Sequence, residues 1–194
     1  SAAAAFKRFR VDSWIHDSSP LEDLPIITPA DALNPYAYGN NAYGKPALGY
    51  LALKDFLGDA PFGKALHAFI DRWHGKHPIP WDLFNTFDEV TGQDLRWFWN
   101  SWFFTNGYID LAIRGVEKTG SGYSVVLENI GGMPAPADLR AHYSDGSTQS
   151  IHETSAIWAA DRRSATVAIS TRKSLDSLAL EGGIWMDADS TNNR

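Results

Sequence analysis

Histidine and carboxylate side chains are the groups in this sequence that could bind a metal ion or move a proton. A helical zinc motif requires two imidazoles one turn apart on the same face, with a glutamate beside them that deprotonates zinc-bound water. None of the six histidines stands four residues from another; they are His16, His67, His74, His77, His142 and His152. The chain also has no cysteine that could supply a thiolate ligand. We therefore predict no metal site and no resident cofactor in this stretch of sequence.

The nearest approach to a ligand pair is formed by His74 and His77. Gly75 and Pro78 interrupt the helix that would align the two rings, and no third ligand lies near them in the sequence. We therefore favour a surface or core-edge position for both histidines over a metal site.

Carboxylates could supply a general acid and a general base if two of them faced each other across a cleft. Asp82, Asp88 and Glu89 follow no pattern that would place two of them in this way. We expect them to be solvated, with Asp82 near a helix start, where the helix dipole favours a negative charge.

Aromatic residues are concentrated in one segment, because five of the eight tryptophans fall between Trp73 and Trp102. Exposed rings could form a platform on which sugars stack, and Trp97, Trp99 and Trp102 are the candidates for it. Their helical spacing favours packing in a core instead. The segment therefore predicts a densely packed helical core.

The composition limits the class of protein and the kinds of partner. With 44% hydrophobic and 21% charged residues, the chain should fold, and 194 residues are enough for two small domains. A net charge of −6 without a long basic cluster argues against nucleic acid as a partner. No apolar run approaches the roughly 20 residues that span a membrane, so we predict no membrane-spanning helix.

Helical patterns dominate the first part of the chain. Residues 2–9 could form a helix, and the prolines between residues 20 and 35 predict an extended, turn-rich connection up to about residue 39. Asn41 could cap a buried helix over residues 47–57, which Gly58 ends. Further helices are predicted over residues 59–73, between the non-helical residues 77–80 and Gly92, and around residues 95–103.

Alternating patterns take over after Asn106 and Gly107. Strands are predicted around residues 109–113, 123–127, 139–143, 148–153, 165–169 and 175–180, with a hairpin turn at Asp145 and Gly146. Short strands at this spacing are typical of a sandwich. The predicted fold is therefore α+β in series, with a helical subdomain over residues 1–107 and an immunoglobulin-like β-sandwich over residues 108–194.

Residues 41–48 (NAYGKPAL), followed by an apolar helix, resemble the tyrosine-bearing stretch of the gluzincin zinc aminopeptidases, the family of aminopeptidase N and leukotriene hydrolase. Residues 62–76 are similar to its next aromatic helix, and residues 76–84 (KHPIPWDLF) and 91–99 (TGQDLRWFW) are similar to the segments that come after it. The resemblance covers most of the chain from about residue 28.

The resemblance assigns a role to Tyr43, which matches the family's tyrosine whose phenol hydrogen-bonds the oxyanion of the tetrahedral intermediate. Tyr38 and Asn40, in the same loop, are candidate substrate contacts. Pattern alone favours a tyrosine that packs its ring at a helix start, and it is the resemblance that favours the catalytic role. The family's zinc motif, zinc ligands and amine-binding strand do not occur here, which implies that zinc belongs to the parent protein upstream of residue 1.

The resulting hypothesis is a carboxy-terminal fragment of a zinc metallo-aminopeptidase, inactive alone, which supplies the oxyanion-stabilising tyrosine and a β-sandwich accessory domain. Its expected partners are the amino-terminal catalytic half of the same protein and a peptide substrate, and an exposed apolar face could cause self-association. The resemblance favours a bacterial periplasmic or secreted location. The alternative is a non-catalytic module that binds a protein or a carbohydrate.

Overall fold

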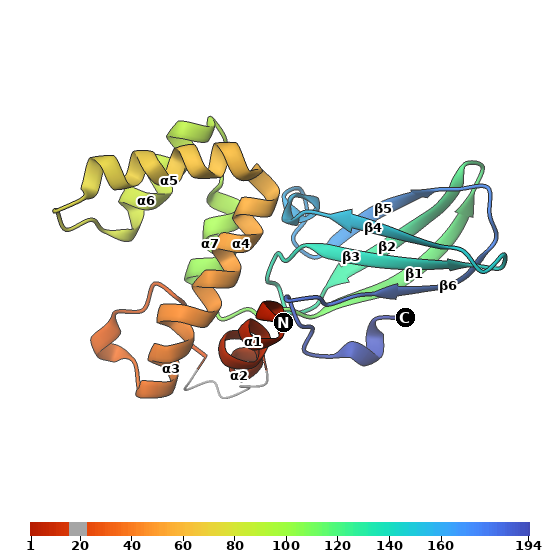
Figure 1. Cartoon of the computed structure of the whole chain (residues 1–194), viewed down its shortest axis with the longest axis horizontal. Helices are drawn as coiled ribbons and strands as arrows, with labels where there is room; N and C mark the ends of the chain where they lie inside the picture. Colours follow the sequence, from red (N-terminus) through yellow and green to blue (C-terminus); the bar gives the residue numbers. More distant parts are fainter. Residues whose placement is uncertain (16–22) are drawn as a thin grey trace.

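The computed structural model describes residues 1–15 and 23–194 and has a helical part followed by antiparallel strands (Figure 1). This order confirms the predicted mixed α+β class, with helices preceding strands. The immunoglobulin-like character of the strand region and the boundary near residue 107 stay predictions. His16 and the part of the predicted turn-rich connection over residues 16–22 lie outside the described residues.

The chain begins with three short helical segments that run into one another. They are α1 (Ala2–Phe6), the π-helical η1 (Lys7–Val11) and α2 (Asp12–Ile15), so the predicted helix over residues 2–9 is confirmed and is longer than expected. Val11 and Ile15 are buried in the core of the helical part. These two side chains therefore anchor the amino-terminal end against the following helices.

The predicted extended connection up to residue 39 is wrong for its last part, because a helix begins at Pro35. After the 3-10 helix η2 (Ala30–Ala32), the chain forms α3 (Pro35–Gly39), the π-helix η3 (Asn40–Gly44) and α4 (Lys45–Leu57) without a break. Asn34, and not Asn41, is the helix cap, since its side chain accepts hydrogen bonds from the N–H groups of Tyr36 and Ala37. Pro35 starts this helix because its fixed φ suits the first turn.

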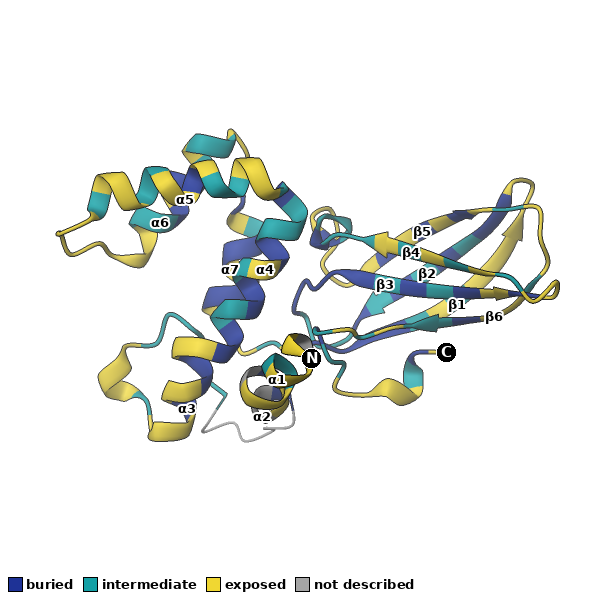
Figure 2. Cartoon of the chain, viewed as in Figure 1, coloured by how far each residue is buried: buried dark blue, intermediate teal, exposed yellow. Residues whose placement is uncertain are grey.

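The remaining helices agree with the sequence patterns. They are α5 (Asp59–Trp73), α6 (Pro80–Thr91) and α7 (Arg96–Phe104), and Gly58 and Gly92 end α4 and α6 at φ angles of 82° and 67°. In Figure 2, buried residues concentrate on α4 and α7, which lie side by side, whereas α5 and α6 extend outward with more exposed surface. The centre of the helical core is therefore the α4–α7 contact.

The predicted aromatic core is confirmed at this contact. Phe98 and Trp102 of α7 are fully buried and Trp99 is 2% exposed, which excludes Trp99 and Trp102 from a sugar-binding platform. A Cβ atom added at Gly49 of α4 would lie 3.1 Å from the Trp102 ring. Glycine at this position therefore allows the two helices to approach closely.

The strands form two antiparallel three-stranded sheets. One has the order β1 (Leu111–Thr119), β2 (Gly122–Asn129) and β5 (Ser164–Ser170), and the other has the order β4 (Thr148–Glu153), β3 (Ala137–Tyr143) and β6 (Leu175–Leu180). Buried side chains of both sheets share one hydrophobic cluster, together with Trp158 of the 3-10 helix η4 (Ser155–Trp158). A last 3-10 helix, η5 (Ser190–Asn192), precedes the carboxy terminus.

The helical part and the strand part are connected by shared packing and hydrogen bonds. The helical core also contains four buried side chains from beyond residue 107: Ile109, Met133, Ala135 and Trp185. Trp97 of α7 packs against both hydrophobic clusters. The Trp102 indole N–H donates to the carbonyl of Pro134 at 3.2 Å. None of the described helices is long and apolar enough to cross a membrane.

Candidate functional site

Tyr43 lies in the π-turn that interrupts the long helix from Pro35 to Leu57. The Lys45 N–H donates to the carbonyl of Asn40, five residues earlier, and Pro46 has no N–H with which to resume the α-helical pattern one residue later. A π-turn accommodates one extra residue in a helix and is often found at functional sites. Tyr43 is 50% exposed, so half of the residue is accessible to solvent at this turn.

The π-turn brings two of the three predicted site residues together. Residues five apart meet across such a turn, and the rings of Tyr38 and Tyr43 pack edge to face with their centroids 6.3 Å apart. Tyr38 is 44% exposed, whereas Asn40 is buried within the turn. The substrate contacts of Tyr38 and Asn40 stay predictions, and the buried position leaves Asn40 little surface for a direct contact.

Two polar side chains hold the opposite side of the π-turn against the preceding segment. Lys45 Nζ donates to Asp23 Oδ1 at 2.6 Å and to the carbonyl of Leu24 at 3.1 Å, and Asn41 Nδ2 donates to the carbonyl of Pro25 at 3.0 Å. The Lys45 side chain is completely buried. Burial lowers the pKa of its ammonium group, and the charge of Asp23 opposes that shift.

Lys45 belongs to the sequence motif at residues 41–48, but its burial and its contact with Asp23 were not predicted. The signal that could have identified it is a lysine at the start of an otherwise apolar helix, since a buried lysine requires a charged partner. The partner itself lies 22 residues earlier in a segment without regular structure. Its position could therefore not be predicted from helical spacing.

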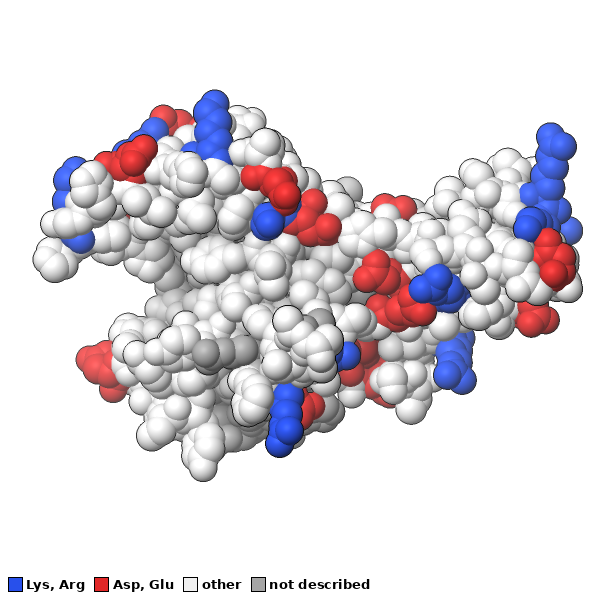
Figure 3. All heavy atoms as spheres, viewed as in Figure 1, with Lys and Arg blue, Asp and Glu red and all other residues white. Residues whose placement is uncertain are grey.

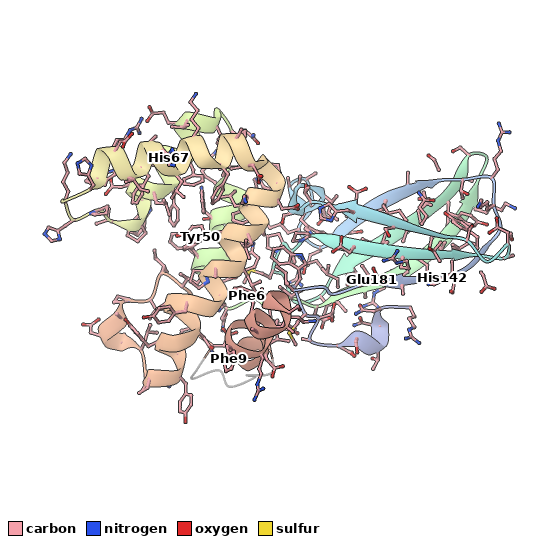
Figure 4. All side chains as sticks on the ribbon, in the orientation of Figure 1. Phe6, Phe9, Tyr50, His67, His142 and Glu181 are labelled. Carbon is pink, nitrogen blue, oxygen red and sulfur yellow. The ribbon has the colours of Figure 1, made fainter. Side chains whose placement is uncertain are left out.

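An apolar cleft of about 910 Å³ opens on the same side of the molecule as the α5–α6 pair. Figure 3 shows this hollow between the α5–α6 arm and the α3 region, with surface that is free of charged groups. Tyr50 of α4 forms part of its wall (Figure 4), and burial raises the pKa of its phenol. The residues lining the cleft are mainly aromatic and aliphatic, among them Ile26, Phe62, Leu66, Phe69, Trp81 and Phe84.

Tyr43 and the cleft belong to the same continuous helical run. Tyr43 precedes Tyr50, which lines the cleft, by seven residues, or roughly 10 Å along the axis. Tyr43 itself is not among the residues that line the cleft. The cleft was not predicted from patterns in the sequence.

Asp82, Glu89 and His74, three of the side chains named from the sequence, take structural roles. Asp82 accepts a hydrogen bond from the N–H of Ile79 at the start of α6, as its predicted position requires. Glu89 pairs with Arg72 on the surface, and His74 Nδ1 lies 3.1 Å from the carbonyl of Ile70. Within residues 1–15 and 23–194, no group of three histidine or acidic side chains is arranged to hold a metal ion.

Comparison with known proteins relates the chain to aminopeptidases. No family model matches the sequence. The chain is 30% identical over 67 residues to aminopeptidase N of Lactococcus lactis subsp. lactis, a match that covers 34% of this chain and 8% of that protein. The crystal structure of Legionella pneumophila aminopeptidase A in complex with aspartic acid matches with a TM-score of 0.55 at 17% identity.

The structural match covers 92% of this chain and 21% of the Legionella protein, so nearly the whole fold described above occurs within that larger enzyme. The chain thus spans only a small part of both relatives. The two matches together support a relationship between this chain and aminopeptidases.

Proposed function

We propose that this chain is the carboxy-terminal part of a zinc-dependent aminopeptidase of the gluzincin type, in which Tyr43 stabilises the oxyanion. The observation that carries the proposal is the half-exposed Tyr43 on a π-turn, in a chain related to aminopeptidases. The described residues do not fit a zinc site. We therefore assign zinc and the general base to the amino-terminal half of the parent protein.

The chemistry assigned to Tyr43 is donation of one hydrogen bond to the negative oxygen that forms when a peptide carbonyl is attacked. A neutral donor fixed in place interacts more strongly with this oxygen than with the uncharged carbonyl, and so lowers the activation barrier. Loss of one such donor costs roughly 2.7–4 kcal/mol in comparable sites. The edge-to-face contact with Tyr38 limits the directions available to the Tyr43 ring.

The apolar cleft is, in this proposal, the surface on which the amino-terminal half of the parent protein packs. Its walls are mainly apolar, and two of the apolar side chains that line it, Ile79 and Trp81, are 58% and 48% exposed. An apolar surface of this kind is expected at an interface with another part of a protein. The strand region acts as an accessory domain with an immunoglobulin-like sandwich fold.

The test is an assay of the full-length parent protein with an aminoacyl chromogenic peptide, with and without a zinc chelator. Tyr43→Phe should lower kcat by about 10²–10³-fold, because only the phenol oxygen is lost. Tyr36→Phe is the matched control, since Tyr36 lies seven residues earlier and is 74% exposed. Chelator-insensitive activity, or full activity of Tyr43→Phe, would contradict the proposal, and absence of peptidase activity would favour a non-catalytic binding module.

A further inference from the structure

Lys45 and Asn41 together hold the π-turn at three points. Their side chains stand one helical turn apart, and their three hydrogen bonds, of 2.6, 3.1 and 3.0 Å, go to three consecutive residues, Asp23, Leu24 and Pro25. Two contacts at different heights along an axis prevent rotation about that axis as well as sliding. The segment 23–25 therefore fixes the orientation of the turn.

Tyr43 projects from the other side of this turn. It lies two residues from both Asn41 and Lys45, which is about half a helical turn in each direction. Burial agrees with this geometry, because Lys45 is 0% and Asn41 5% exposed, whereas Tyr43 is 50% exposed. Any rotation of the turn about the helix axis would therefore swing the Tyr43 phenol sideways.

The size of that swing is large compared with the tolerance of a catalytic hydrogen bond. A side-chain tip about 6 Å from the axis moves by about 2 Å when the helix rotates by roughly 20°. Donors in oxyanion sites act over about 2.7–3.1 Å, and a misplacement of about 1 Å can cost a factor of 10² in rate. Accurate placement of the phenol thus requires that the turn be held.

Stability alone does not explain a fully buried lysine at this position. A buried ion pair loses hydration energy that its mutual attraction barely recovers, and apolar side chains of similar size often stabilise a protein equally well. The lowered pKa of Lys45 agrees with this cost. What the ion pair provides, and an apolar pair does not, is a directional connection between two segments that are 22 residues apart.

We propose that Lys45 and Asn41 are positioning residues that fix the direction of the Tyr43 phenol by fastening the π-turn to residues 23–25. This inference rests on the proposed catalytic role of Tyr43. Neither Lys45 nor Asn41 contacts the substrate in this scheme. Both act through the backbone of the turn.

The first measurement follows Tyr43 directly in the 194-residue chain, labelled with 3-fluorotyrosine at position 43 and observed by ¹⁹F NMR. Lys45→Met and Asn41→Leu should each shift or broaden the resonance, because the ring samples more orientations. Lys54→Met is the matched control, since Lys54 lies on the same helix and pairs with Asp59 at the surface. Far-UV circular dichroism verifies folding, and Asn41→Leu decides the outcome if Lys45→Met does not fold.

The second measurement is a double-mutant cycle in the full-length parent protein. Lys45→Met should lower kcat by about 10²-fold with KM changed less than about twofold, and should have no further effect in a Tyr43→Phe background. Equal effects in both backgrounds, or an unchanged ¹⁹F resonance in folded variants, would overturn the positioning role. A fully active Tyr43→Phe protein would instead overturn the catalytic role, so the two failures are distinguishable.

Discussion

His152 connects the strand region to the helical region through two carboxylates, and replacing it should make stability depend differently on pH. Its Nδ1 lies 2.6 Å from Asp138 Oδ1 on β3, and its Nε2 lies 3.1 Å from Asp55 Oδ1 on α4. Both ring nitrogens can donate only in the imidazolium form. The hydrogen bond with Asp138 is the main cause of a raised His152 pKa, the two carboxylate charges add to it, and partial burial opposes it.

The sign of the effect follows from the raised pKa. A folded-state pKa above the unfolded value of about 6.5 means that folding favours proton binding. The stabilisation is fully present below about pH 6.5 and disappears as the pH rises through the folded-state pKa. Since the imidazole is 48% exposed, each pair is comparable to a surface ion pair of about 0.2–1 kcal/mol. Two such pairs give about 1 kcal/mol, or roughly 2–4 °C in Tm.

The assay compares thermal unfolding of the wild-type chain and His152→Gln from pH 5.5 to pH 8.5. We expect the variant to melt about 2–4 °C lower at the acidic end, and the difference to shrink as the pH increases. His142→Gln is the control, because His142 is an exposed histidine on the adjacent strand β3 (Figure 4). A difference that is constant with pH, or that grows toward alkaline pH, would refute the proposed ion pairs.

Two further predictions concern packing. Gly49→Ala should destabilise the chain by about 1–3 kcal/mol in denaturant unfolding, because the new Cβ would lie 3.1 Å from the Trp102 ring. Gly63→Ala, in α5 with no heavy atom within 4 Å of the added Cβ, should be neutral or stabilise by about 0.5–1 kcal/mol. If Gly49→Ala and Gly63→Ala changed the free energy of unfolding by the same amount, the close α4–α7 approach would not be the cause of the destabilisation. The isolated chain should also associate as its concentration rises in analytical ultracentrifugation, and Trp81→Lys at the cleft should reduce this, whereas Val116→Lys on β1 should not. A monomer at all concentrations would contradict an exposed interface.

Most elements of this fold could be predicted from the sequence because their signals are local. The helices α5, α6 and α7 have apolar side chains at helical spacing, and the strands β4 and β6 have the predicted bounds of 148–153 and 175–180. Gly58 and Gly92 mark helix ends through positive φ angles, which residues with a side chain rarely adopt. Such signals depend only on neighbouring residues.

The features that could not be predicted depend on distant parts of the chain. The π-turn at residues 40–44 lies inside a helical run that continues on both sides, from Pro35 to Leu57, whereas the sequence pattern predicted a helix that begins after Asn41. The Lys45–Asp23 pair joins the π-turn to a segment without regular structure that lies 22 residues earlier. The apolar cleft needs α4, α5, α6 and residues 26–29 in place before it exists. Tyr43 was identified as a candidate, but its surroundings were not.

The sharing of side chains between the two halves has a consequence for how this region could be recombined. Met133, Ala135 and Trp185 belong to the strand half in sequence but complete the core of the helices, and Trp97 contacts both cores. A strand domain transplanted from another protein would have to bring matching apolar residues at these points, or leave voids beside α7. We therefore regard the strand half as a co-adapted partner of its own helices, which evolution or protein engineering could exchange only together with the surface on which it rests.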